Sequence, residues 1–96
     1  MPTHNPLTLV LARKPGIEYR SISDSGFLAS PDTGTLYHLN PTGSAIWHLL
    51  EQPTTHAEIT STLQAAFPNT PAELIVSDVK QIVTQLLERQ LITIYP

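Results

Sequence analysis

The chain contains no cysteine, and only four of its 96 residues are glycine. The absence of cysteine excludes disulfides, a thiolate nucleophile and a cysteine-ligated zinc site. The glycines, at positions 16, 26, 34 and 43, are scattered through predicted turns and one helix start, so no glycine-rich phosphate-binding loop is present. These absences remove several common classes of enzyme and metal protein.

Residue types that serve acid–base or nucleophilic catalysis are present but not grouped. The four histidines are not spaced as a metal pair on one turn of a helix, and we interpret His48 and His56 as ordinary surface residues. The serines lack the context of a nucleophile elbow, and no pair of acidic residues ends a predicted strand. We therefore expect a protein that is not an enzyme and that holds no metal and no cofactor.

No apolar run is long enough to cross a membrane. In "MPTHNPLTLVLARKPG" the basic residues follow a short apolar stretch, which is the reverse of a signal peptide. We expect a cytoplasmic protein without membrane association. With 41% apolar and 14% charged residues, the composition is that of a folded globule, and residues 1–96 are predicted to form one domain.

Positive charge is scarce, with five Lys and Arg against eight Asp and Glu. The two signs cancel in residues 1–50, whereas residues 51–96 carry only Lys80 and Arg89 against five carboxylates. The C-terminal half is therefore acidic, which disfavours contact with a nucleic-acid backbone.

Short β-prone segments fill the first half of the chain. Leu7 to Ala12 and, more weakly, Ile17 to Ser23 are predicted strands. Phe27 to Ser30 and Thr35 to Leu39 flank "PDTG", a turn in which Gly34 takes a positive φ, so they are predicted to form a hairpin. On the second strand of this hairpin, alternate residues share a face. One face holds Thr35, Tyr37 and Leu39, and the other holds Leu36 and His38.

Three helices are predicted to follow, each opened by a capping residue. Asn40 caps the first, with Pro41 at its first position. Thr55 with Glu58 forms a capping box for the second, and Thr70 is expected to cap the third, which ends near Gln90. We expect Trp47 and Tyr37 to belong to the core and Gly43 to allow close packing against the preceding strand.

The order of strands and then helices predicts an α+β fold of the winged helix-turn-helix type. Its antiparallel sheet has three strands, or four if "LITIY" from Leu91 to Tyr95 joins it, and three helices cover one face.

The third helix distinguishes two kinds of partner. As the recognition helix of a DNA-binding protein it would need basic outward residues, but Asp78 and Glu88 lie there with few cations. Its apolar stripe is broad, and Val76, Val79 or Val83 extends beyond what one core face requires. Beside a free strand edge, such a helix suits an extended peptide that adds a strand. We therefore prefer peptide binding to DNA binding.

Three successive stretches resemble the PqqD-like proteins: "YHLNPTGSAIWHLL" (37–50), "THAEITSTLQAAFP" (55–68) and "DVKQIVTQLLERQLI" (78–92). The resemblance covers about residues 26–92. It implies a winged-helix leader-peptide recognition domain, also called a RiPP recognition element, which serves ribosomally made and modified peptides. The family often has glycine where this chain has Gln52 and Gln90.

The stretch "SPDTGTLYHLNPTGSAIW" (30–47) is most similar to the standalone members of lasso-peptide pathways. That resemblance implies that a precursor's leader binds as an extra strand beside the third helix. The protein would then deliver the precursor to a separate leader peptidase, papain-like or transglutaminase-like. A PqqD-type peptide chaperone of pyrroloquinoline quinone biosynthesis is the alternative. The residues expected to contact the leader are Leu36, Tyr37, His38 and Leu39 on the strand and Val76, Asp78, Val79, Lys80 and Val83 on the helix, with helix capping as an equal alternative for Asp78.

Overall fold

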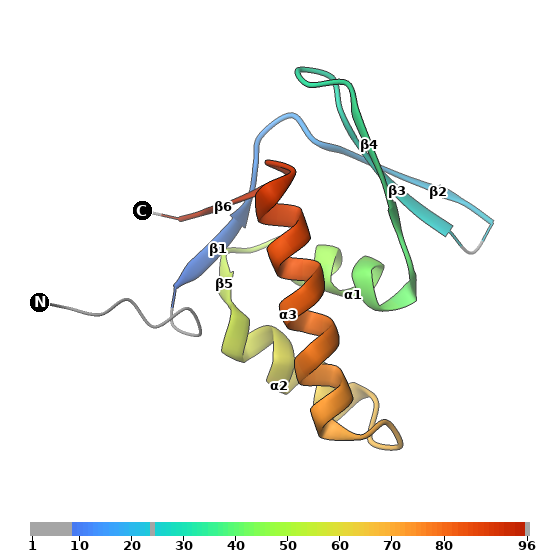
Figure 1. Ribbon diagram of the computed structural model, residues 1–96, viewed down its shortest axis with the longest axis vertical. Helices are drawn as coiled ribbons and strands as arrows, with labels where there is room; N and C mark the ends of the chain where they lie inside the picture. Colours follow the sequence, from blue (N-terminus) through green and yellow to red (C-terminus); the bar gives the residue numbers. More distant parts are fainter. Residues whose placement is uncertain (1–8, 24, 96) are drawn as a thin grey trace, which may run out of the picture.

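A computed structural model describes residues 9–23 and 25–95, and it has strands before and after a group of three helices (Figure 1). Leu7 and Thr8, the start of the first predicted strand, lie outside the described residues. The elements are β1 (Val10–Arg13), β2 (Glu18–Ile22), β3 (Ser25–Ser30), β4 (Thr35–Leu39), α1 (Pro41–Leu49), β5 (Thr54–Thr55), α2 (His56–Ala66), α3 (Ala72–Glu88) and β6 (Ile92–Ile94).

The strands form two antiparallel sheets, where the sequence predicted one. The order β2-β3-β4 makes the first sheet, and β5-β1-β6 makes the second. The C-terminal segment does add a strand, as expected, but it pairs with β1, where Leu11 lies opposite Ile94. The two-residue strand β5 was not predicted, because Thr54 and Thr55 have the sequence signature of a helix start. The α+β class of winged-helix type is confirmed. The prediction of a single sheet was wrong.

The helix starts follow the predicted capping residues in two cases of three. The Asn40 side chain accepts from the backbone N–H of Gly43 at 2.7 Å, and Thr55 Oγ1 accepts from the N–H of Glu58 at 3.1 Å. The prediction that Thr70 caps α3 was wrong, since the capping position is Pro71 and no side chain caps this helix. Proline has already fixed the backbone there, and the first turn instead bonds to the Pro71 carbonyl.

The core lies where α1, α2 and α3 meet the inner faces of both sheets. In Figure 1, α3 crosses the front of the molecule, with β1, β5 and β6 on one side and the β2-β3-β4 sheet on the other. Trp47 is 1% exposed, which confirms it as a core residue. The guanidinium of Arg13 lies 4.4 Å from the centre of the Trp47 ring and donates to the Trp47 carbonyl, so it joins β1 to α1. In the described part of the chain, no helix has both the length and the apolar composition needed to cross a bilayer.

The chain passes from β4 into α1 through Asn40 alone. Leu39 is the last strand residue and is buried, and a Cβ at Gly43 would lie 3.1 Å from the Leu39 Cδ2 and 3.3 Å from the Asn40 Oδ1. Gly43 therefore allows close packing against the end of the strand, as predicted, although the contact is with side chains. This tight junction fixes the direction of β4 relative to the helices.

A Schellman motif ends α3. The N–H of Leu91 donates to the Leu86 carbonyl at 2.9 Å, and the N–H of Gln90 donates to the Leu87 carbonyl at 3.1 Å. Gln90 has φ +59°, the left-handed conformation in which glycine avoids the cost of a Cβ. Leu86 and Leu91 are both fully buried, so the motif also anchors the start of β6.

We predict that Gln90→Gly raises the free energy of unfolding by about 0.5–1 kcal/mol, because it relieves the left-handed strain at some cost in unfolded-state entropy. This corresponds to a few degrees in melting temperature, measured by circular dichroism. Gln52→Gly is the matched control. Gln52 is not among the described residues with positive φ, so that variant should be neutral or less stable. Equal effects at both positions would contradict the conformational explanation.

Candidate functional site

The outer edge of β4 is the feature on which a binding site can be built. Within residues 9–23 and 25–95, β4 pairs on one side only, with β3, in the order β2-β3-β4. Tyr37 and Leu39 face the core side and Leu36 and His38 face outward, as the alternation predicted, and Leu36 is 67% exposed. An edge strand offers a row of backbone donors and acceptors to another extended chain.

The hairpin geometry determines which backbone groups of β4 are free. The N–H of Gly34 donates to the Ser30 carbonyl at 2.8 Å, so the backbone groups of Ser30 point toward β4. Ser30 pairs with Thr35, and the direction alternates along each strand. Thr35, Tyr37 and Leu39 therefore direct their backbone groups toward β3. It follows that the N–H and C=O groups of Leu36 and His38 point to the open side.

The neighbouring hairpin requires the same assignment. Ile22 pairs with Ser25 across a two-residue connection, a spacing at which the flanking residues form a hydrogen-bonded pair. By alternation, Ser25, Phe27 and Ala29 face β2, which leaves the other residues of β3, including Ser30, for β4. Two independent constraints thus agree on the register.

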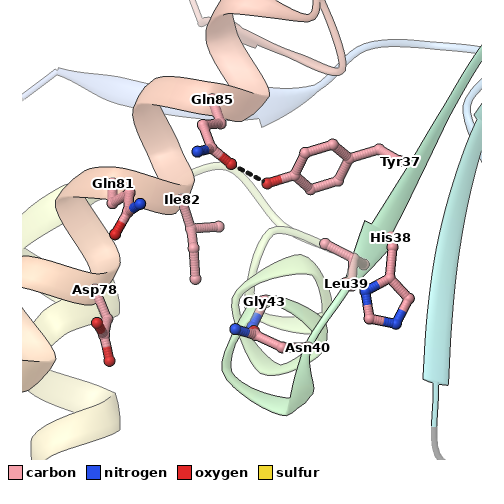
Figure 2. A pocket seen from close by; sticks show the side chains of 9 residues that line it. All are labelled: Tyr37, His38, Leu39, Asn40, Gly43, Asp78, Gln81, Ile82 and Gln85. Atoms are coloured by element: carbon pink, nitrogen blue, oxygen red, sulfur yellow. Dashed lines mark hydrogen bonds between the residues drawn. The ribbon is translucent and has the colours of Figure 1, made fainter.

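A cleft of about 210 Å³ lies between the second half of β4 and α3 (Figure 2). Its strand wall is Tyr37, His38 and Leu39, and the start of α1 forms one end. The α3 wall is mostly polar, with one apolar residue, Ile82, among amides and a carboxylate. The residues that line it are Tyr37, His38, Leu39, Asn40, Gly43, Asp78, Gln81, Ile82 and Gln85.

Tyr37 connects the two walls of the cleft. Its hydroxyl donates to the Oε1 of Gln85, as the dashed line in Figure 2 shows, and the Arg89 guanidinium carbon lies 5.2 Å from the centre of its ring. Burial raises the pKa of Tyr37, an effect that Arg89 opposes. The ring packs against the core but is only partly buried. Tyr37 therefore borders the core, whereas the sequence predicted that it belongs to the core.

The structure separates the helix residues that the sequence had grouped as one wall. Asp78 lies in the cleft, six residues beyond the first residue of α3, so the capping alternative for it is excluded. Val79 is 0% exposed and belongs to the core. Val76, Lys80 and Val83 line a different cavity. The expectation that these four form the wall facing β4 was wrong, because it selected apolar residues, whereas the helix presents amides there.

The period of α3 explains this separation. With about 3.6 residues per turn, Asp78, Ile82 and Gln85 share one flank of the helix. Val76, Val83 and Leu87 share the opposite flank. Between the two flanks lies a buried stripe that includes Ile75, Val79 and Leu86. We name the space on the opposite flank the second cavity. It has a volume of about 430 Å³ and is lined by Leu9, Leu11, His56, Val76, Lys80, Val83, Thr84, Leu87 and Ile94.

His56 lies in this second cavity, and its interpretation as a surface residue was wrong. It is 9% exposed, and within the described residues its Nδ1 is buried without a hydrogen-bond partner. Burial lowers the pKa of His56, and the charge of Lys80 lowers it further. The sequence offered only one signal for this burial, its position in the first turn of α2 directly after β5.

The groups that line the cleft are suited to binding an extended chain. Among residues 9–23 and 25–95, no three His, Cys, Asp or Glu side chains come together in an arrangement that could hold a metal ion. The cleft offers the outward backbone groups of His38, the amides of Gln81 and Gln85, and an apolar contact at Ile82. The outward backbone groups of Leu36 follow two residues further along the same strand edge. This combination suits an extended peptide.

The chain is similar to proteins of one known family in both sequence and fold. The family model described as coenzyme PQQ synthesis protein D (PqqD) matches residues 26–92. The structure of TbiB1 in complex with the TbiA(beta) leader peptide is similar, with a TM-score of 0.74, 25% identity, and coverage of 88% of this chain and 98% of that chain. The PqqD truncation of Methylobacterium extorquens PqqCD, described as a stand-alone RiPP recognition element, aligns at a TM-score of 0.70 and 16% identity over 92% of this chain and 97% of that chain. No curated protein sequence matches.

We predict that protonation of His56 destabilises the fold. Because its pKa is lowered in the folded state, the unfolded state binds more protons below the unperturbed value of about 6.5, and the stability falls as the pH decreases from there toward the lowered pKa. His56→Gln should show a weaker loss of unfolding free energy between about pH 7 and pH 5 in urea titrations. His48→Gln, at an exposed position of α1, is the control and should retain the loss. An unchanged pH dependence in His56→Gln would contradict the prediction.

Proposed function

The chain belongs to the PqqD family, and from that premise we propose that it binds the leader region of a ribosomally made precursor peptide as an additional strand on β4. The bound leader would lie in the cleft between β4 and α3. The protein would then deliver the precursor to a separate processing enzyme, without catalysing a reaction itself.

One observation carries the proposal: the open edge of β4 borders the cleft directly. A leader paired with the backbone of Leu36 and His38 would place the residue opposite Tyr37 on the side of α3. That side chain would meet Ile82 between Gln81 and Gln85. The leader residues on either side of it would lie over the exposed side chains of Leu36 and His38.

The strand contacts expected from the sequence therefore remain part of the proposal, with different roles. Leu36 and His38 offer backbone groups, and Tyr37 and Leu39 contribute to the wall of the cleft. On the helix we propose Asp78, Gln81, Ile82 and Gln85 as the contacts. Because three of these are polar, the specificity for a leader should depend on hydrogen bonding as well as on apolar contact.

The similar structure that contains a leader peptide supports this choice of ligand. We further propose that the pathway is that of a lasso peptide and that the partner is a leader peptidase of papain-like or transglutaminase-like type, in the cytoplasm. This finer assignment rests on the resemblance of residues 30–47 to the standalone members of such pathways. The family description favours pyrroloquinoline quinone biosynthesis as the second candidate.

DNA is a poorer ligand for this surface. The charged residues exposed on α3 are Glu73, Lys80 and Glu88. One cation against two carboxylates gives no net attraction for phosphates, on which DNA affinity largely depends.

We predict that proline substitutions along β4 divide with a period of two. Leu36→Pro and His38→Pro should fold, because each removes an N–H that points away from β3 and so takes no part in the hairpin. They should weaken leader binding by about tenfold or more, since a leader carbonyl is left without its donor. Tyr37→Pro should unfold or melt at a clearly lower temperature, because its N–H bonds to β3. Fluorescence polarisation with the cognate leader measures the affinity, which we expect between about ten nanomolar and a few micromolar for the unmodified protein.

Leu36→Ala and His38→Ala are the matched controls, because they keep the backbone donor and remove only the side chain. Their leader affinity should fall less than that of the proline variants. Strand addition on β4 would be the wrong mechanism if Leu36→Pro and His38→Pro bound normally, or if affinity fell only in variants that lose their circular dichroism signal.

A further inference from the structure

The second cavity is larger and more apolar than the cleft, and the proposed function does not use it. Leu11 of β1, Val83 and Leu87 of α3 and Ile94 of β6 form its walls. The apolar surface continues outside it, because Val76 is 43% exposed and Ile94 is 48% exposed. A cavity with an apolar rim is typical of a surface that another protein covers.

The electrostatics of this cavity differ from those of the surrounding half of the chain. Among the described residues, the two ionisable groups that line it, Lys80 and His56, are both bases, and no carboxylate lines it. Lys80 is exposed and lines the same cavity as His56, and its charge lowers the pKa of His56. Within the described residues Lys80 forms no ion pair, the only one there being between Arg20 and Glu18. The cavity therefore complements a ligand that is apolar and carries a negative charge at its edge.

The position of the cavity leaves the cleft accessible. The two sites lie on opposite flanks of α3, and Figure 1 places β1 and β6 on the far side of this helix from β4. A protein seated on the second cavity and a leader paired with β4 would therefore contact different faces of α3.

We propose that the second cavity is a docking site for the processing enzyme, which inserts an apolar side chain next to a carboxylate that pairs with Lys80. This inference rests on the proposed function, since it identifies the partner as the enzyme that receives the precursor. It assigns leader binding and enzyme binding to the two flanks of one helix.

The first experiment compares Lys80→Glu with Arg20→Glu, which makes the same charge change on an exposed residue of β2. Leader affinity and processing of the precursor by its cognate enzyme are measured for each. Lys80→Glu should keep its leader affinity within about twofold and should weaken the enzyme's apparent affinity for the complex by about tenfold or more. Arg20→Glu should change neither. Normal processing by the Lys80→Glu complex would overturn the proposal, and so would loss of leader affinity, which would make the cavity part of the leader site.

The second experiment tests the chemistry of the cavity without a leader, so it also gives an answer if the proposed function fails. In ¹⁵N-edited NMR spectra, 4-phenylbutyrate should shift the signals of Val83, Leu87 and Ile94 more than its uncharged amide does. Lys80→Glu should remove that difference.

Equal shifts with acid and amide, or shifts confined to the cleft, would overturn the proposal. Acid-dependent binding that appears only after deletion of residues 1–8 would also overturn it, because the chain's own N-terminal segment would then be the occupant. Dimerisation would also overturn the proposal, because a second copy of the chain would then be the occupant. It would appear as a molecular mass that doubles as the concentration rises in the unmodified protein but not in Lys80→Glu.

Discussion

The buried stripe of α3 is the constraint on which both candidate sites depend. Ile75, Val79, Ile82 and Leu86 recur at helical spacing and lie at or near full burial. Each contributes about 1.5–3 kcal/mol when it is removed from water, so the rotation of the helix about its axis is fixed. In the part of the chain that the structure describes, no strand of one sheet pairs with a strand of the other, and α3 lies between the two sheets. Each flank of the helix therefore faces a different sheet, and a recess forms on either side of the buried stripe.

The second constraint is the direct passage of β4 into α1. Leu39 is buried as the last strand residue, and Asn40 accepts the N–H of Gly43 at once, so no loop follows that could cover the strand edge. Most proteins protect such an edge because it can pair with other chains. Here the edge is short, five residues, and α3 stands beside it. Pairing is thereby limited to a ligand that fits between the strand and the helix. A strand edge that could otherwise aggregate can in this way recognise a specific ligand.

The sequence predicted what is determined locally. The helices and the β3–β4 hairpin follow from apolar spacing, prolines and the caps at Asn40 and Thr55, all of which act within a few residues. The pairing of β1 with β5 and β6 was missed, because it joins segments more than 40 residues apart and leaves no local pattern. Of the α3 residues that line the cleft, only Asp78 was predicted as a contact. Periodicity locates the buried stripe of α3 but not which flank faces β4, and the choice of valines favoured apolar character where the structure has Gln81 and Gln85.

The most direct test of strand addition is amide hydrogen exchange on β4, measured residue by residue by NMR with and without the cognate leader. In the free protein Tyr37 and Leu39 should already exchange slowly, because their N–H groups bond to β3, while Leu36 and His38 should exchange fast. A saturating leader should slow the exchange of Leu36 and His38 by about tenfold or more and leave the other two nearly unchanged. Protection that appears on Thr93 and Ile94 of β6 instead, or none at Leu36 and His38 with the leader bound, would contradict the account.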